Sequence, residues 1–138
     1  MKNIFSILTL TLTLALLSFS AQANSAAETS SAVEIQDTDS TLYIAILGKN
    51  VRSVEDIHTL FIKALGLSAD YSKTFEGLQA ELLKFKSKRF QVTVYDGAHL
   101  SLNIGEQAHD KLLEVLNTAQ DKNLDSSGYP NLMIYYWQ

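Results

Sequence analysis

The chain has 138 residues, no cysteine and a formal net charge of −4 at pH 7. The absence of cysteine excludes a disulfide framework, a thiol nucleophile and a lipid attached to a thiol. The negative charge argues against binding of nucleic acid, because phosphates are bound by Lys and Arg side chains that displace counterions. We therefore expect one small domain whose partner, if charged, is basic.

The N-terminal residues have the pattern of a secretion signal. Lys2 supplies a positive start, residues 4–19 are mostly apolar, and Ala21-Gln22-Ala23 has the small residues of a cleavage site. An uncleaved anchor helix is the alternative, but the apolar run is shorter than the ~20 residues that span a membrane. We predict a signal peptide over residues 1–23, cut after Ala23, and a periplasmic or secreted product without stable membrane insertion.

The next segment, residues 24–40, is rich in Ser, Ala, Thr, Glu and Asp. It offers almost no apolar surface, so we predict a disordered acidic tether followed by a folded domain over residues 41–138. The domain begins with Leu42 to Leu47, a run that is apolar at every position. A strand with one wet face alternates apolar and polar residues, so this run predicts a strand covered on both faces, typical of parallel sheets.

Two amphipathic helices are predicted after this strand. Ser53 and Asp56 form a variant of the capping box at the start of the first helix. Ser72 or Thr74 can cap the second helix. Gly77 lies inside that second helix, where glycine costs ~1 kcal/mol relative to alanine, and it permits close approach by another group.

The remaining sequence predicts a strand over residues 90–95, a turn at Asp96-Gly97, a helix over residues 106–120 and a last apolar strand over residues 132–136. The order is strand, two helices, strand, helix, strand. Connections of this length favour right-handed crossovers between parallel strands. The predicted fold class is therefore α/β, with a small three-stranded parallel sheet packed with three to four helices.

The sequence lacks the common signatures of catalysis and metal binding. It has no Gly-x-Ser-x-Gly elbow and no Gly-rich phosphate loop, and no pair among its three His residues has i, i+4 spacing. We therefore predict no enzyme activity, no catalytic residue, no metal and no cofactor. We interpret His58 as a partly buried helix residue that is bonded locally, and His109 as a residue on a solvated helix face.

Two clusters have alternative interpretations. The basic run from Lys84 to Arg89 is either an anion or membrane patch or the solvated end of a helix, and the negative total charge favours the helix end. The aromatic run from Tyr135 to Trp137 is either an exposed docking patch or part of the core with edge cover. The core interpretation is favoured, because such a cluster in a terminal strand is more often core than interface.

The stretch from Gly48 to Leu83 resembles the barstar family of ribonuclease inhibitors. The end of an apolar strand, a capped helix, an irregular hinge and a second amphipathic helix follow in that order. The most specific block is Arg52-Ser53-x-x-Asp56-Ile57-His58, and the resemblance extends over most of residues 43–137. It implies a three-stranded parallel sheet packed with helices, and a protein that plugs the active site of a small secreted ribonuclease.

The resemblance also implies which residues bind the enzyme. In the family, the second helix and the segment before it place acidic and aromatic side chains in a phosphate-binding cleft, where a carboxylate replaces a phosphate. Aligned without gaps, the first acidic position is Glu76 and the aromatic pair is Asp70-Tyr71. The family's Trp position is Gln79, and its deepest acidic position is Ala80. The predicted partner-binding residues are these five, with Glu76 pairing with an Arg or Lys of the target.

These observations predict a secreted or periplasmic inhibitor of a small basic ribonuclease, with a monomer favoured. The alternative is a periplasmic interaction module that keeps the barstar fold and binds a partner other than a nuclease. Gln79 and Ala80 support this alternative, because they depart from the family's pattern.

Overall fold

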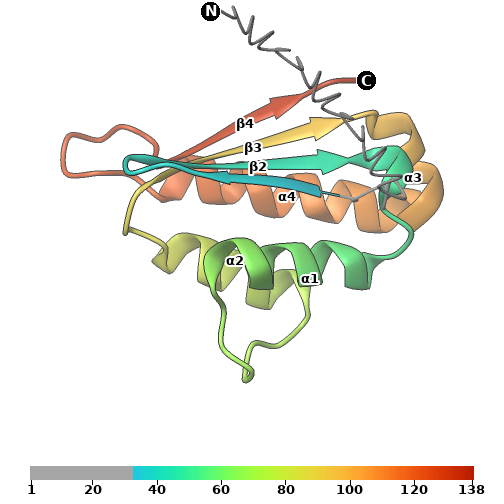
Figure 1. Cartoon of the computed structure of the whole chain (residues 1–138), viewed down its shortest axis with the longest axis horizontal. Coiled ribbons are helices and arrows are strands. Elements are labelled where there is room, and N and C mark those ends of the chain that lie inside the picture. The colour runs from blue at the N-terminus through green and yellow to red at the C-terminus, as the bar shows by residue number, and fades with distance from the viewer. Residues whose placement is uncertain (1–32) are drawn as a thin grey trace, which may run out of the picture.

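The computed structural model describes residues 33–138 (Figure 1). The predicted signal peptide, residues 1–23, and the part of the predicted tether before residue 33 lie outside the described residues. The elements of the described part are, in order, β1 (Val33–Asp37), β2 (Thr41–Leu47), η1 (Gly48–Asn50), α1 (Val54–Leu65), α2 (Phe75–Lys84), β3 (Arg89–Tyr95), α3 (Gly97–Ile104), α4 (Glu106–Lys122) and β4 (Leu132–Tyr136).

The four strands form one sheet in the order β1-β2-β3-β4. β2, β3 and β4 are parallel, and β1 is antiparallel to β2. The fold is α/β, as predicted, but the sheet is mixed and has four strands instead of three parallel ones. The parallel part agrees with the prediction that the long helical connections are crossovers between parallel strands.

The additional strand, β1, comes from residues 33–37, which the sequence analysis placed in the disordered tether. Ile35 packs against the core, and the Thr38 hydroxyl donates to Thr41 O at 2.7 Å and accepts from Thr41 N at 3.0 Å. This turn pairs a mostly polar segment with the edge of β2, so backbone hydrogen bonds compensate for its small apolar surface. The sheet therefore includes residues 33–37, which precede the predicted start of the domain at residue 41.

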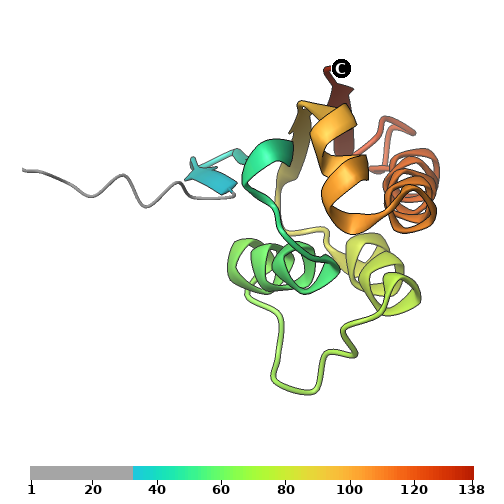
Figure 2. The same ribbon diagram turned by 90° about the vertical axis from the view of Figure 1, so that its right-hand side faces the viewer.

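The helices lie on one side of the sheet, and the described residues leave its other face open (Figures 1 and 2). Along β2, Leu42, Ile44 and Ile46 are buried, whereas Tyr43 is 39% exposed. The prediction that β2 is covered on both faces is therefore wrong. Its sequence is apolar on both faces, but the described helices cover only one of them.

The core lies between the sheet and the helices. Most of it comes from the alternate side chains of the three parallel strands and from the apolar stripes of α1, α2 and α4, as their helical periodicity predicts. The largest fully buried side chains are Phe61, Phe90, Ile44, Ile46, Ile57, Leu78, Leu82, Leu100, Leu112, Leu116, Leu132 and His58.

The helix ends follow the predicted signals at α1 and α2. Ser53 and Asp56 form both hydrogen bonds of the capping box of α1, and the Thr74 side chain caps α2. α3 was not predicted, because it begins at Gly97, where the sequence indicated a turn. Gly97 lies against the ring of Tyr136, where a Cβ atom would overlap the phenol. The predicted third helix is α4, which continues two residues further, to Lys122.

Candidate functional site

The five predicted partner-binding residues lie on α2 and on the loop before it. This loop, residues 66–74, projects from the helical side of the molecule, away from the sheet (Figures 1 and 2). Asp70, Glu76 and Ala80 are exposed, whereas Tyr71 and Gln79 are half-buried. Glu76, Gln79 and Ala80 share one face of α2 because their i, i+3 and i+4 spacing matches the helical repeat.

Short-range contacts hold the projecting loop against the start of α2. The Thr74 side chain accepts a hydrogen bond from Gly77 N at 3.0 Å. A Cβ atom at Gly77 would lie 2.5 Å from the carbonyl oxygen of Ser72 and would overlap its hydroxyl. The structure therefore confirms that Gly77 permits a close approach, and it identifies Ser72 as the group that approaches.

The hydroxyl of Tyr71 has a partner inside the chain. It forms a 2.8 Å hydrogen bond with Nδ1 of His58, which is 2% exposed. The ring of Phe75 lies 5.5 Å from the His58 ring, between centroids. His58 is thus more buried than predicted, and this bond reaches 13 residues along the chain instead of a near neighbour. Tyr71 fixes the loop to α1 in addition to any contact with a partner.

Burial sets the protonation of this pair. Burial first, and the nearby carboxylate of Glu81 second, raise the pKa of Tyr71 to about 12. Burial also lowers the pKa of His58 below its usual value of 6.5. At neutral pH the phenol therefore carries its proton and the imidazole is uncharged.

Lysine side chains accompany most of the acidic residues of this surface. Glu76 has a side chain that is 75% exposed and lies 3.9 Å from Nζ of Lys111. Glu55 pairs with Lys73, and Glu81 pairs with Lys84 at 3.0 Å. Within residues 33–138, Asp70 is exposed and makes no ion pair. Exposed pairs of this kind are worth at most ~1 kcal/mol, so a cation of a partner can displace the lysines at small cost.

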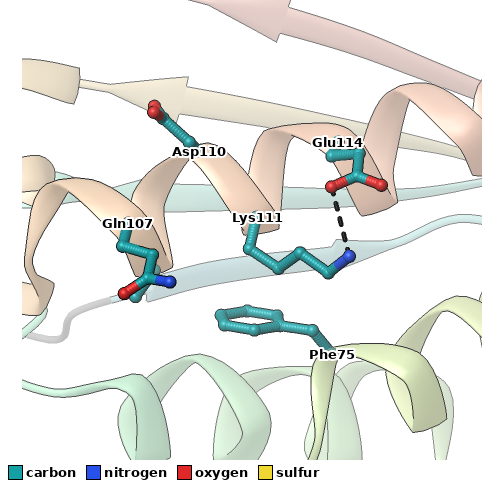
Figure 3. Close-up of a pocket in the computed structure, with 6 residues that line it drawn as sticks. Phe75, Gln107, Asp110, Lys111 and Glu114 are labelled. Carbon is teal, nitrogen blue, oxygen red and sulfur yellow. Dashed lines mark hydrogen bonds and ion pairs between the residues drawn. The ribbon is translucent and has the colours of Figure 1, made fainter.

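An open cavity of about 660 Å³ lies beside Glu76, between the start of α2 and the exposed side of α4. In Figure 3 the Lys111 side chain runs between α4 and the ring of Phe75, and its amine bonds Glu114 at 3.1 Å. This cavity was not predicted from the sequence, because its two walls are far apart in the chain. The only signal was the polar repeat on one face of α4. The lining residues are Phe75, Gln107, Ala108, Asp110, Lys111 and Glu114.

The basic run from Lys84 to Arg89 does not act as one patch. Lys86 bonds the side chain of Asn123, Lys88 bonds Asp37 at 2.5 Å, and Arg89 lies 3.5 Å from Asp125. The run is therefore divided among separate partners within the chain. Only Lys84 lies in the last turn of α2, so the interpretation as a helix end holds for this residue alone.

His109 is buried, which corrects the prediction of a solvated helix face. Its Nε2 forms a 2.8 Å hydrogen bond with the hydroxyl of Tyr136, because this side of α4 faces β4. Tyr136 is accordingly half-buried, as the core interpretation requires. Tyr135 and Trp137 are 43% and 60% exposed, so the core interpretation is wrong for them.

In the described part of the chain, no three His, Asp or Glu side chains come together as a metal site. None of the helices between residues 33 and 138 is long and apolar enough to cross a membrane.

No protein-family model and no curated protein sequence matches this chain.

Proposed function

We propose that the chain is a barstar-like inhibitor of a small basic ribonuclease, and that α2 with its preceding loop enters the cationic cleft of the enzyme. The observation that carries the proposal is the exposed carboxylate of Glu76 on α2, beside a projecting loop that carries the exposed Asp70. The order of β2, α1, α2 and β3 in a parallel sheet is consistent with the scaffold that the sequence resemblance implies.

Electrostatics gives the proposal its mechanism. A ribonuclease cleft presents Arg, Lys and His to the phosphates of RNA, and a carboxylate offers the same pair of acceptor oxygens as a phosphate. Glu76 exchanges its long contact with Lys111 for a charge-assisted hydrogen bond to the enzyme. That bond is stronger than an exposed pair, because the interface excludes water from it.

The cavity beside Glu76 extends the same surface. It combines the carboxylates of Asp110 and Glu114 with the ring of Phe75. An Arg side chain of the enzyme fits such a cavity, because its guanidinium group stacks on an aromatic ring and bonds a carboxylate at the same time. We therefore include α4 in the proposed binding surface, with Lys111 moving aside.

The proposed target is exported like the inhibitor itself. The predicted cleavage after Ala23 would release the chain into the periplasm or the medium, where it meets a secreted or periplasmic nuclease. The chain is proposed to act by blocking that enzyme and to have no catalytic activity, metal or cofactor of its own.

A second function is an interaction module that binds a partner other than a nuclease. Two observations favour it. Gln79 and Ala80 replace the aromatic and acidic residues that the resemblance leads us to expect. In addition, Lys73, Lys84 and Lys111 lie beside the carboxylates, so the surface is less negative than its carboxylates alone would make it.

The test is an RNA-cleavage assay with the mature chain, residues 24–138, against a set of small basic secreted ribonucleases. We expect dose-dependent inhibition by the unmodified chain. Glu76→Gln should weaken binding by at least about tenfold, which corresponds to ~1.4 kcal/mol. Asp121→Asn is the matched control, because it removes one exposed carboxylate from the far end of α4 and should leave inhibition unchanged.

Two results decide against the proposal. If none of the ribonucleases is inhibited, inhibition is rejected, and recovery of another protein on the immobilised chain supports the second function. If inhibition occurs but Glu76→Gln and Asp121→Asn bind equally well, the role of Glu76 is rejected and another surface carries the binding.

A further inference from the structure

The open face of the sheet is unusually rich in large apolar side chains. Tyr43, Tyr95, Met133 and Tyr135 project from it and are 39–44% exposed, and Trp137, which follows β4, is 60% exposed. Ala45 and Leu47 project from the same face. An exposed surface of this size and composition on a soluble domain marks an interaction site.

The sequence of the strands indicates that this face has a cover. β2 is apolar from Leu42 to Leu47 and β4 from Leu132 to Tyr136, so both strands present apolar residues on two sides. Such strands are typical of sheets with a layer packed on each face. The helices provide one of these layers, and the other is missing from the described residues (Figure 2).

The charges of the face suit a second copy of the same chain. Among the outward positions of the four strands, Glu34 and Arg89 are the charged residues, and their charges have opposite signs. Two identical faces therefore meet without like-charge repulsion, although the chain as a whole is negative. The tyrosine hydroxyls and the side chain of Gln91 both donate and accept hydrogen bonds, so each can pair with its own kind.

The face also has both a hollow and an exposed large side chain that could fill it in a second copy. A shallow hollow of about 400 Å³ lies on the part of the face that β1, β2 and β3 form. Its lining includes Tyr43, Gln91, Thr93 and Tyr95. Trp137 projects at the opposite edge, beyond β4. In a dimer with two-fold symmetry, every contact between the copies occurs twice. If Trp137 of one copy enters the hollow of its partner, Trp137 of the partner therefore enters the hollow of the first copy.

The exposed area is close to what a dimer needs. With about 200 Å² for each large side chain, the exposed fractions of Tyr43, Tyr95, Met133, Tyr135 and Trp137 amount to about 450 Å². A standard interface uses ~800 Å² per partner, and homodimer interfaces are ~65% apolar, which requires about 500 Å². Ala45 and Leu47, which are partly exposed on the same face, add to this area.

We propose that the chain forms a homodimer in which the open sheet faces pack together, with Trp137 of each copy in the hollow of the other. This proposal differs from the expectation of a monomer from the sequence. Sheets stack face to face at ~10 Å, so side chains of this size fill the space between them. The helices separate this face from the loop between α1 and α2, so both loops of the dimer remain accessible (Figure 1).

The test is sedimentation equilibrium of the mature chain alone from about 1 to about 200 µM, a range that covers the affinities of interfaces of this size. We expect a monomer–dimer equilibrium. Trp137→Ala should raise the dissociation constant at least about tenfold, the equivalent of losing ~1.4 kcal/mol. Leu102→Ala is the matched control, because Leu102 is 80% exposed on α3, away from the sheet face, and should change nothing.

Fluorescence supplies a second readout, because Trp137 is the only tryptophan of the chain. Its emission should shift to longer wavelength on dilution through the same concentration range, as the indole leaves the partner and meets water. A chain that stays monomeric throughout the range overturns the proposal, as does a dimer that is weakened equally by the two substitutions. Neither experiment involves a ribonuclease, so its outcome is independent of inhibition.

Discussion

The hydrogen bond between Tyr71 and His58 offers the sharpest test of how the projecting loop is held. Tyr71→Phe removes the hydroxyl and keeps the ring. It leaves Nδ1 of His58 without its 2.8 Å partner in a site where the imidazole is 2% exposed. The loop also loses its polar link to α1, while the contact of the imidazole with the Phe75 ring remains.

The size of the effect follows from burial. A buried polar group that loses its partner costs ~1–3 kcal/mol. Tyr71 is only half-buried, so water can reach the vacated position in part, and we expect the lower half of this range, about 1–2 kcal/mol. For a domain of about 100 residues this corresponds to a fall in Tm of roughly 5–15 °C.

The assay is urea denaturation at pH 7.5 followed by circular dichroism, with Tyr129→Phe as the matched control. Tyr129 is 66% exposed, so loss of its hydroxyl should have almost no effect on the free energy of unfolding. A double-mutant cycle with His58→Leu isolates the bond, because Tyr71→Phe should cost much less when the imidazole is already absent. The reasoning is refuted if Tyr71→Phe is no more destabilising than Tyr129→Phe.

Three further predictions concern stability. Burial lowers the pKa of His58, so its contribution to the free energy of unfolding is complete above pH 6.5 and decreases as the pH falls toward the lower pKa of the folded state. Urea titrations at pH 7.5 and pH 5 should show this loss in the unmodified chain and a smaller one in His58→Leu; equal losses would contradict it. Gly77→Ala should lower the free energy of unfolding, although the same change in an open helix raises it by ~1 kcal/mol, because the Cβ atom would overlap Ser72. A rise in the urea midpoint would contradict this prediction and would show that Ser72 and its loop can move away from the added methyl group. Asn123→Ala should cost at least about 2 kcal/mol, because this fully buried amide donates to two carbonyls at the end of α2 at 2.7 and 2.9 Å. Asn117→Ala, at an exposed position of α4, is its control, and similar losses in both variants would contradict the assignment.

The parts of the fold that depend on local periodicity could be predicted from the sequence. The apolar stripes and caps of α1, α2 and α4 are visible within a few turns of chain, and the apolar runs of β2 and β4 identify them as strands. α3 has only eight residues and begins with a turn dipeptide, so its helical pattern is too short to outweigh Gly97. β1 is a strand only because the edge of β2 offers it hydrogen-bonding partners.

In the candidate site, too, the features that depend on local sequence could be predicted, and the features that depend on contacts between distant elements could not. The exposure of Glu76 follows from its place opposite the apolar stripe of α2, so the sequence alone predicted it. The partner of Tyr71 and the approach of Lys111 depend on contacts between separate elements, and no local pattern encodes them. For β2, the sequence correctly indicated apolar residues on both faces, but composition cannot tell which neighbour covers each face.

The pairing of β1 with β2 has a consequence for how the chain folds. The register joins Asp37 to Leu42 across a tight turn, whereas the segment between Ile44 of β2 and its partner Val92 of β3 contains both α1 and α2. Nearby segments find each other much sooner than distant ones. We therefore expect β1 to pair with one edge of the apolar β2 before β3 pairs with the other edge. This early pairing shortens the time in which the first edge is free to pair with another chain and aggregate. Deleting β1 should accordingly increase aggregation during refolding markedly, while it lowers the free energy of unfolding of the folded domain only slightly.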